Sequence, residues 1–318
     1  MLESQAIGLL AALGTVLCWT VGTFAFTDAS KKMLPSAVNR VRLVLASILL
    51  SFSCVLTDHT SLYDLFTQTS PNAYLWFGLS GIIGLSLGDY FAFTAYQLIG
   101  GAKTALMSCI APAAALLFAY FMLDETLSGL GILGICISMS GILLLIYSNQ
   151  GNQLATSQTL GSVSKGFLFA FLGAICQGIG LVLAKNGFQT ETHAMSAIHA
   201  TWIRMFVAAV VLYLFTGFNK QSITEFKQVF GNKKILKPIL MGSVFGPVIG
   251  VSLSLLATQN LTAGITQTLL SLLPASVTLA SVFVFKEKLN KRIFISLFIS
   301  LLGVIVLIWR TQIADFIF

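Results

Sequence analysis

The chain has 318 residues, of which 56% are apolar and only 9% are charged. Soluble domains carry roughly 25% charged residues, so this composition excludes an ordinary soluble protein. The net charge of +7 lies mostly between apolar runs, where it fits contact with anionic lipid head groups and gives no indication of nucleic-acid binding.

Long runs without a charged residue recur along the chain, and about 20 such residues cross a bilayer as a helix. The alternating strands of a membrane β-barrel are absent from the sequence. We therefore expect an all-α integral membrane protein with ten transmembrane helices, the first a retained span and not a cleaved signal peptide. The expected spans are 5–26, 38–56, 74–97, 103–123, 128–148, 166–184, 197–217, 237–259, 264–285 and 292–310.

Residues 74–148 and 236–310 carry the same pattern, displaced by 162 positions. The matched pairs are Gly84 and Gly246, Gly88 and Gly250, Gln97 and Gln259, Pro112 and Pro274, Glu125 and Glu287, and Gly141 and Gly303. Weaker matches extend the duplication to the first third of each half. We expect a first five-helix repeat at 1–148, a linker at 149–165 and a second repeat at 166–318.

Five spans per repeat is an odd number, so the second repeat must enter the membrane from the opposite side. The halves are then inverted repeats, related by a pseudo-twofold axis in the membrane plane. Membrane chains built in this way are most often transporters, because the two halves supply nearly equivalent closures toward the two sides.

The paired motifs resemble those of the EamA-type family of the drug/metabolite transporter superfamily. They run from Gly88 through Pro112 to Glu125 in the first half, and from Gln259 through Pro274 to Glu287 in the second. The resemblance covers nearly the whole chain. It implies ten helices around a central cavity and carriage of small polar metabolites, often export of amino acids or their relatives, without identifying the substrate.

Basic residues are unevenly distributed between the two sets of loops. The first set, joining spans 1–2, 3–4, 5–6, 7–8 and 9–10, holds most of the lysines, whereas the opposite set holds Lys185, with Arg310 at the C-terminal edge. The positive-inside rule then places both termini outside the cytoplasm of an inner or plasma membrane. The family is usually drawn with both termini inside.

Asp89 is the only carboxylate deep in an expected span, and a charge at that depth normally faces a cavity or a partner. It is a candidate proton or cation site or a contact for a substrate amine. The alternative is an ion pair with Arg42 or Arg204 that only joins helices. These arginines occupy matching places and could bind a substrate carboxylate as a bidentate fork, or reach the head groups, as expected for Arg40.

Aromatic and neutral polar side chains complete the candidate site. Trp19 and Tyr90 are the aromatic candidates for a cavity that holds an ammonium group, unless they face lipid. Gln177, Thr266 and Gln267 offer neutral hydrogen bonds, although polar residues in spans more often join helices.

Proline and glycine mark expected hinges and helix contacts. Pro112 and Pro274 each free the carbonyl four residues earlier, which predicts either hinges near the midplane or static kinks. The glycines expected at close helix contacts are Gly84, Gly88, Gly246 and Gly250.

The two turn glutamates are the last candidates. Glu125 and Glu287 are expected to act as favourable N-terminal charges for spans five and ten, with a gate contact as the alternative.

These features favour a secondary transporter, working as an exporter of small polar solutes by alternating access. The sequence lacks the G-x-x-x-x-G-K-[ST] motif of a self-contained ATP-driven pump. A flippase for a lipid-linked sugar or lipid head group, an integral-membrane enzyme and a channel are the alternatives. We expect no enzyme activity, cofactor or metal. The expected partners are the bilayer, a small solute and a proton or another cation, with the chain acting as a monomer or homodimer.

Overall fold

The structure is a computed structural model that describes residues 2–57, 61–67, 69–99, 101–153, 163–191, 195–216, 220–285, 291–310 and 312–313. Every regular element in these ranges is helical. The first half contains α1 (Leu2–Ser30), α2 (Pro35–Thr57), α3 (Leu62–Thr67), α4 (Pro71–Gly81), η1 (Ile82–Leu87), α5 (Gly88–Ile99), α6 (Gly101–Ser108), α7 (Ala111–Leu123) and α8 (Gly129–Gln153). The second half contains α9 (Val163–Thr190), α10 (Ala197–Thr216), α11 (Lys220–Gly231), α12 (Lys233–Ser243), η2 (Val244–Val251), α13 (Ser252–Asn260), α14 (Ala263–Leu270), α15 (Leu273–Phe285) and α16 (Lys291–Ile308).

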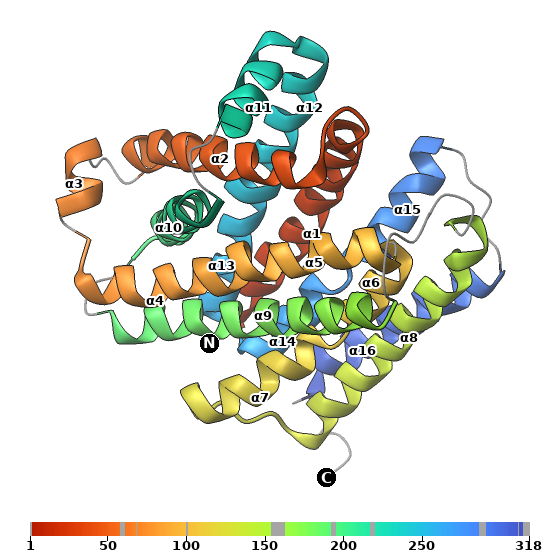
Figure 1. The fold of residues 1–318 in the computed structure, drawn as a ribbon. Coiled ribbons are helices and arrows are strands. Elements are labelled where there is room, and N and C mark those ends of the chain that lie inside the picture. The colour runs from red at the N-terminus through yellow and green to blue at the C-terminus, as the bar shows by residue number, and fades with distance from the viewer. Residues whose placement is uncertain are drawn as a thin grey trace. The chain divides into compact units, whose positions relative to one another are not determined.

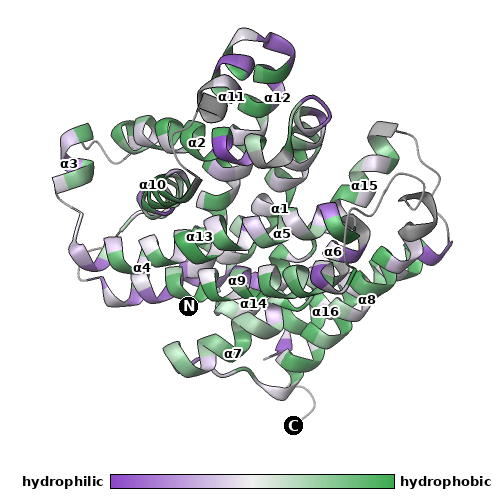
Figure 2. Ribbon diagram, viewed as in Figure 1, coloured by the Kyte–Doolittle hydropathy of each residue, from purple (hydrophilic) through white to green (hydrophobic). Residues whose placement is uncertain are grey.

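The helices match the expected membrane spans closely. Within the described residues, nine helices are long and apolar enough to cross a membrane, and Ala111–Leu123 is a shorter apolar helix. Figure 2 shows apolar residues along most of the length of α8 and α16, with polar residues at the tip formed by α11 and α12. The prediction of an all-α membrane protein is therefore confirmed, and the broken pair α6–α7 occupies the remaining expected span, 103–123.

The duplication seen in the sequence is repeated in the helix boundaries. A shift of 162 residues carries α4 onto α12, α6 onto α14 and α7 onto α15, with both ends of each helix matching. The same shift carries the start of η1 onto the start of η2, so both copies widen into a π-helix at the same place. Two copies of one sequence pattern therefore fold into two copies of one set of helices.

Two of the spans are interrupted just before the matched prolines. α6 ends at Ser108 and α7 begins at Ala111, so that Pro112 lies in the first turn of a new helix. Pro274 has the same position in α15, after the break at residues 271–272. Proline is tolerated in a first turn because its missing N–H would have no helical partner there. The two spans are therefore interrupted where hinges or kinks were expected, and motion at these points stays a prediction.

The chain forms two compact units. One comprises Met1–Tyr90 and Ile179–Leu261, and the other comprises Phe91–Gly178 and Thr262–Phe318. Each unit takes segments from both predicted repeats. The two units are therefore not the two repeats. The repeat boundaries expected from the sequence, 1–148 and 166–318 with a linker at 149–165, stay a prediction.

In the first unit, α2 and α10 pack as an antiparallel pair. Trp202 Nε1 donates a 2.8 Å hydrogen bond to Ser51 Oγ. Arg40 and Tyr213, which occupy the positions equivalent to Trp202 and Ser51 after the 162-residue shift, are electrostatic neighbours. Ser51 comes after Arg40 in α2, but its partner Trp202 comes before Tyr213 in α10, so the two helices run in opposite directions. The 162-residue shift also converts each of the two contacts into the other. That is the pattern of a twofold axis perpendicular to both helices.

The second unit contains a pair of helices with the same symmetry, α8 and α16, which lie side by side in Figure 1. A Cβ atom on Gly141 would lie 2.7 Å from Ser300 Cα, and one on Gly303 would lie 2.6 Å from Ser138 Cα. Gly303 and Ser300 are the 162-residue equivalents of Gly141 and Ser138, so the contacts are reciprocal and antiparallel. Equivalent helices that run in opposite directions confirm that the repeats are inverted.

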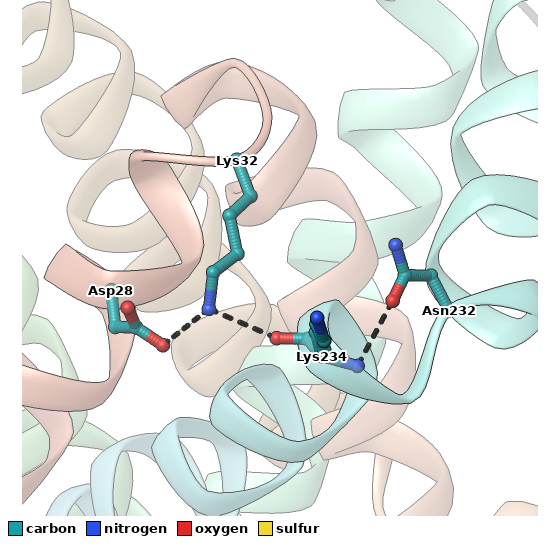
Figure 3. Close-up of polar contacts among 4 residues, drawn as sticks. All are labelled: Asp28, Lys32, Asn232 and Lys234. Atoms are coloured by element: carbon teal, nitrogen blue, oxygen red, sulfur yellow. Dashed lines mark hydrogen bonds and ion pairs between the residues drawn. The ribbon is translucent and has the colours of Figure 1, made fainter.

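Two short helices were not expected from the sequence. α3 and α11 follow α2 and α10 at corresponding places in the two halves. The amphipathic α11 buries Val229 against Val38 and Ile235. Nearby, Lys32 Nζ lies 2.6 Å from Asp28 Oδ2 and 3.1 Å from the Lys234 carbonyl, which attaches the turn after α1 to the start of α12 (Figure 3).

Candidate solute-binding site

Asp89 and Arg42 form an ion pair inside the first unit. Nη2 of Arg42, from α2, donates to Oδ2 of Asp89, from the first turn of α5. The side chains of Arg42 and Asp89 are only 19% and 15% exposed. Ionised groups so far inside a membrane-spanning bundle persist when they are paired, and this pairing explains how Asp89 is accommodated. The ion pair considered from the sequence therefore exists, and it joins Asp89 to Arg42.

Arg204 is the third charged member of the site. It lies on α10, is 6% exposed and is an electrostatic neighbour of Asp89. Arg42 and Arg204 each lie seven residues after the first residue of their helices, about 10 Å along the axis. Because α2 and α10 are antiparallel, the arginines approach from opposite ends of the pair, with Asp89 near both.

The internal symmetry is broken at the acidic position. A shift of 162 residues carries Arg42 onto Arg204, but it carries Asp89 onto Val251, a buried apolar residue. The two repeats thus supply two equivalent cations and one carboxylate. Nε of Arg42 and Nε of Arg204 are both buried without a hydrogen-bond partner.

The backbone just before Asp89 is a π-helix, η1, packed closely against neighbouring helices. Gly84 of η1 lies against α9, because a Cβ atom on Gly180 would be only 3.0 Å from Gly84 Cα. A methyl group on Gly81 would overlap the Arg204 carbonyl. A π-helical turn changes the angular register of the helix after it and is frequent at functional sites. The small residues at these contacts let the span carrying Asp89 approach α9 and α10.

The second π-helix makes the equivalent contact. A Cβ atom on Gly22 of α1 would lie 3.3 Å from Gly246 Cα in η2. Gly250, the last of the matched glycines on this helix, packs directly against the indole of Trp19, and its counterpart Gly88 is buried. The close packing expected at Gly84, Gly246 and Gly250 is therefore present in the structure.

The two aromatic candidates lie in different environments. Trp19 is partly buried against the core cluster that contains Val251 and Leu255. Tyr90, although adjacent to Asp89 in the sequence, is 57% exposed. A further ring takes part instead, because the guanidinium of Arg42 lies 5.5 Å from the ring centroid of Phe26. A cation over an aromatic face is stabilised by the ring quadrupole.

The neutral polar candidates belong to the second unit. Thr266 is fully buried, and its hydroxyl donates a 3.1 Å hydrogen bond to the Thr262 carbonyl one turn earlier in the chain. Gln267 and Gln177 are partly buried. Their part in solute binding stays a prediction, as do the hinge roles of Pro112 and Pro274.

Two basic side chains act differently from the sequence expectation. Arg40 does not reach for the head groups: it pairs with Glu225 of α11, a residue that no sequence signal singled out. Lys185 is not in a loop: it is buried in α9 and donates to the Leu261 carbonyl at the end of α13. A cation at a helix C-terminus is favourable to the helix dipole.

Glu125 contacts a different helix from the one expected. Its Oε2 atom accepts a 2.8 Å hydrogen bond from the N–H of Ala263, the first residue of α14, whereas span five was expected to be its partner. Its counterpart Glu287 lies outside the described residues. In the part of the chain that is described, no three His, Cys, Asp or Glu side chains are placed to hold a metal ion.

Comparisons with known proteins agree with this architecture. The model of the EamA-like transporter family matches residues 6–147 and 164–309, one stretch in each half, and the chain belongs to this family. A solved crystal structure, described only as that of a protein, has the same fold, with a TM-score of 0.71, 18% sequence identity and coverage of 99% of this chain and 98% of the other. No curated protein matches the chain. The molecule is thus a multi-pass membrane transporter of the drug/metabolite transporter type.

Proposed function

We propose that this protein is a secondary carrier that exports small polar metabolites, such as amino acids or their relatives, by alternating access. The ionic cluster of Arg42, Asp89 and Arg204 would take part in solute binding and in coupling. A proton or another cation would supply the driving force through Asp89. Both termini would lie outside the cytoplasm, because the lysine-rich loops that join spans 1–2, 3–4, 5–6, 7–8 and 9–10 lie on the other side of the membrane from the termini.

The observation that carries this proposal is the reciprocal contact pattern of the equivalent helices. Ser138–Gly303 and Gly141–Ser300 repeat each other about a twofold axis, so a conformation open to one side has a near-equivalent open to the other. Two conformations of similar free energy are what alternating access requires.

The position of the charges supports a role in the transport cycle. Arg42 and Arg204 approach from opposite ends of an antiparallel pair, and both lie near Asp89, which is paired with Arg42. In a low-dielectric bundle, a change in the protonation or pairing of Asp89 alters the free energy of the cluster strongly. In this proposal, ion binding at Asp89 is therefore coupled to the exchange between conformations.

Transport by purified protein in liposomes tests the proposal. Vesicles with an imposed proton or sodium gradient are supplied with labelled amino acids, nucleosides, sugars and polyamines, and solute accumulation is measured. We expect saturable, gradient-dependent accumulation of a water-soluble solute, and its loss in Asp89→Asn. Asp28→Asn, which removes an exposed carboxylate, serves as the matched control and should transport normally.

The other classes of protein give different results in the same vesicles. Unchanged accumulation in Asp89→Asn contradicts the coupling role of Asp89. Translocation of fluorescent lipid-linked sugar without solute uptake would indicate a flippase, and flux that does not saturate would indicate a channel. Chemical conversion of the added solute would indicate an enzyme.

A further inference from the structure

The cluster on α2, α5 and α10 has an unbalanced charge. It contains two guanidinium groups, Arg42 and Arg204, and one carboxylate, Asp89. Asp89 is the acidic group that acts on Arg204, whereas Glu225 is bound to Arg40, Glu191 to Ser70 and Glu125 to Ala263. A buried cation without a counter-ion is costly, because the bundle solvates charge poorly.

The single carboxylate is committed to Arg42. Asp89 Oδ2 accepts from Nη2 of Arg42, whereas Nε of Arg204 is buried with no hydrogen-bond partner. Nε of Arg42 has none either. The site therefore presents unsatisfied N–H donors on two positive groups that lie beside the same carboxylate.

Symmetry shows which group would have completed the site. If both repeats carried the acid, Arg204 would face a carboxylate at position 251, where the chain has Val251 instead. The second repeat therefore has the arginine, Arg204, but lacks the acid that pairs with the equivalent arginine in the first repeat. A planar or tetrahedral oxyanion is the ligand that a guanidinium fork binds best.

We propose that the transported solute carries an anionic oxygen group, a carboxylate or a phosphate, and that Arg204 binds this group. The solute supplies the negative charge that Val251 does not. Trp19, which packs at Gly250 one residue before Val251, lies beside the solute group attached to the anion. This inference rests on the proposed carrier function, since it names the chemical class of its substrate.

Thermal unfolding of the purified full-length protein in detergent tests the inference with matched solute pairs. The probes are succinate and succinamide, N-acetyl-leucine and N-acetyl-leucinamide, glycerol 3-phosphate and glycerol, and a panel of amino acids with their amides. An anionic member at about 100-fold excess over its Kd should raise the unfolding midpoint by roughly 5 °C, and its neutral partner should not. The pairs distinguish a carboxylate from a phosphate.

Four variants locate the effect. Arg204→Gln should lose the response, and Arg204→Lys, which keeps the charge but not the fork, should retain part of it. Val251→Asp supplies the missing carboxylate within the chain and should abolish the response while the protein stays folded, which covers the case that Arg204→Gln fails to fold. Lys227→Gln removes an exposed charge of α11 and should respond as the wild type does.

Three results would overturn the inference. They are equal shifts by acids and their neutral partners, an anion response that survives both Arg204→Gln and Val251→Asp, and a wild type that responds to no anionic probe. Transport in liposomes separates this inference from the proposed function. Gradient-driven uptake of only neutral or cationic solutes would support the proposed carrier function and contradict the anion site. Anion binding without any transport would support the anion site and contradict the carrier function.

Discussion

Arg40 of α2 and Glu225 of α11 form a bidentate ion pair, in which Nε of Arg40 lies 2.9 Å from Oε2 of Glu225 and Nη2 donates to Oε1. Both side chains are largely buried, at 14% and 9% exposure. At the equivalent place in the other repeat, Trp202 stacks on Phe206 and meets the edge of Phe66 in α3. The two halves thus attach their extra helices by different chemistry, ionic in one and aromatic in the other.

Removing one partner of this ion pair should destabilise the protein strongly. Arg40→Ala leaves Glu225 buried and unpaired, and such a loss costs about 3–5 kcal/mol. We expect a correspondingly lower free energy of unfolding for Arg40→Ala, measured by denaturation in mixed micelles. The double variant Arg40→Ala with Glu225→Ala should recover part of the loss. Equal values for the single and double variants would contradict the coupling.

The contact between α8 and α16 should not accept a single methyl group. Gly141→Ala places a Cβ atom against the Ser300 backbone, and overpacking of this kind costs roughly 1–3 kcal/mol. Gly303→Ala should cost a similar amount, because its contact with Ser138 is the symmetric equivalent. Gly129→Ala, with nothing within 4 Å, is the control and should be neutral or slightly stabilising. The measurement is the thermal unfolding midpoint, and a harmless Gly141→Ala would refute the reciprocal packing.

Glu125 should stabilise the start of α14. Glu125→Ala removes the acceptor for the Ala263 N–H and the negative charge at a helix N-terminus, at a cost of about 1 kcal/mol. Glu125→Gln keeps an acceptor and should lose about half as much. Hydrogen exchange at the Ala263 amide reports the change directly, and an exchange rate that is the same in all three proteins would exclude the contact.

The hydrogen bond between Trp202 and Ser51 can be weighed by a double-mutant cycle. Ser51→Ala and Trp202→Phe each remove one partner of the 2.8 Å bond, and each should cost about 1 kcal/mol or more. Because both act on one interaction, their combination should cost less than the sum of the two. Strictly additive losses in the free energy of unfolding would show that the α2–α10 register is different.

Cysteine labelling in intact cells should decide the orientation. In a background without native cysteines, position 58 is expected to react with an impermeant reagent from outside, and position 227 is expected to react only after the cells are opened. Lys227 is an exposed residue of α11 and so suits the assay. Labelling from outside at position 227 alone would place both termini inside the cytoplasm.

The membrane class, the spans and the duplication could be predicted from the sequence because each depends only on the order of residues along the chain and not on contacts between distant segments. Hydrocarbon thickness sets the length of an apolar run, and a repeated pattern at 162 residues needs only the linear chain. The inversion followed from the odd number of spans. Even Asp89, the candidate acid that lies deep in an expected span, was visible as a charge inside an apolar run.

Partner choice depended on tertiary structure. The sequence left Asp89 free to pair with Arg42 or Arg204, and it gave Glu225 no distinguishing feature. These pairings depend on the antiparallel register of α2 and α10 and on the π-helix that orients Asp89, since contacts between distant segments are fixed by packing and not by local pattern. Sequence therefore determined which helices form and that they are duplicated, whereas the folded structure decided which buried charges neutralise each other and which arginine stays without a carboxylate of its own.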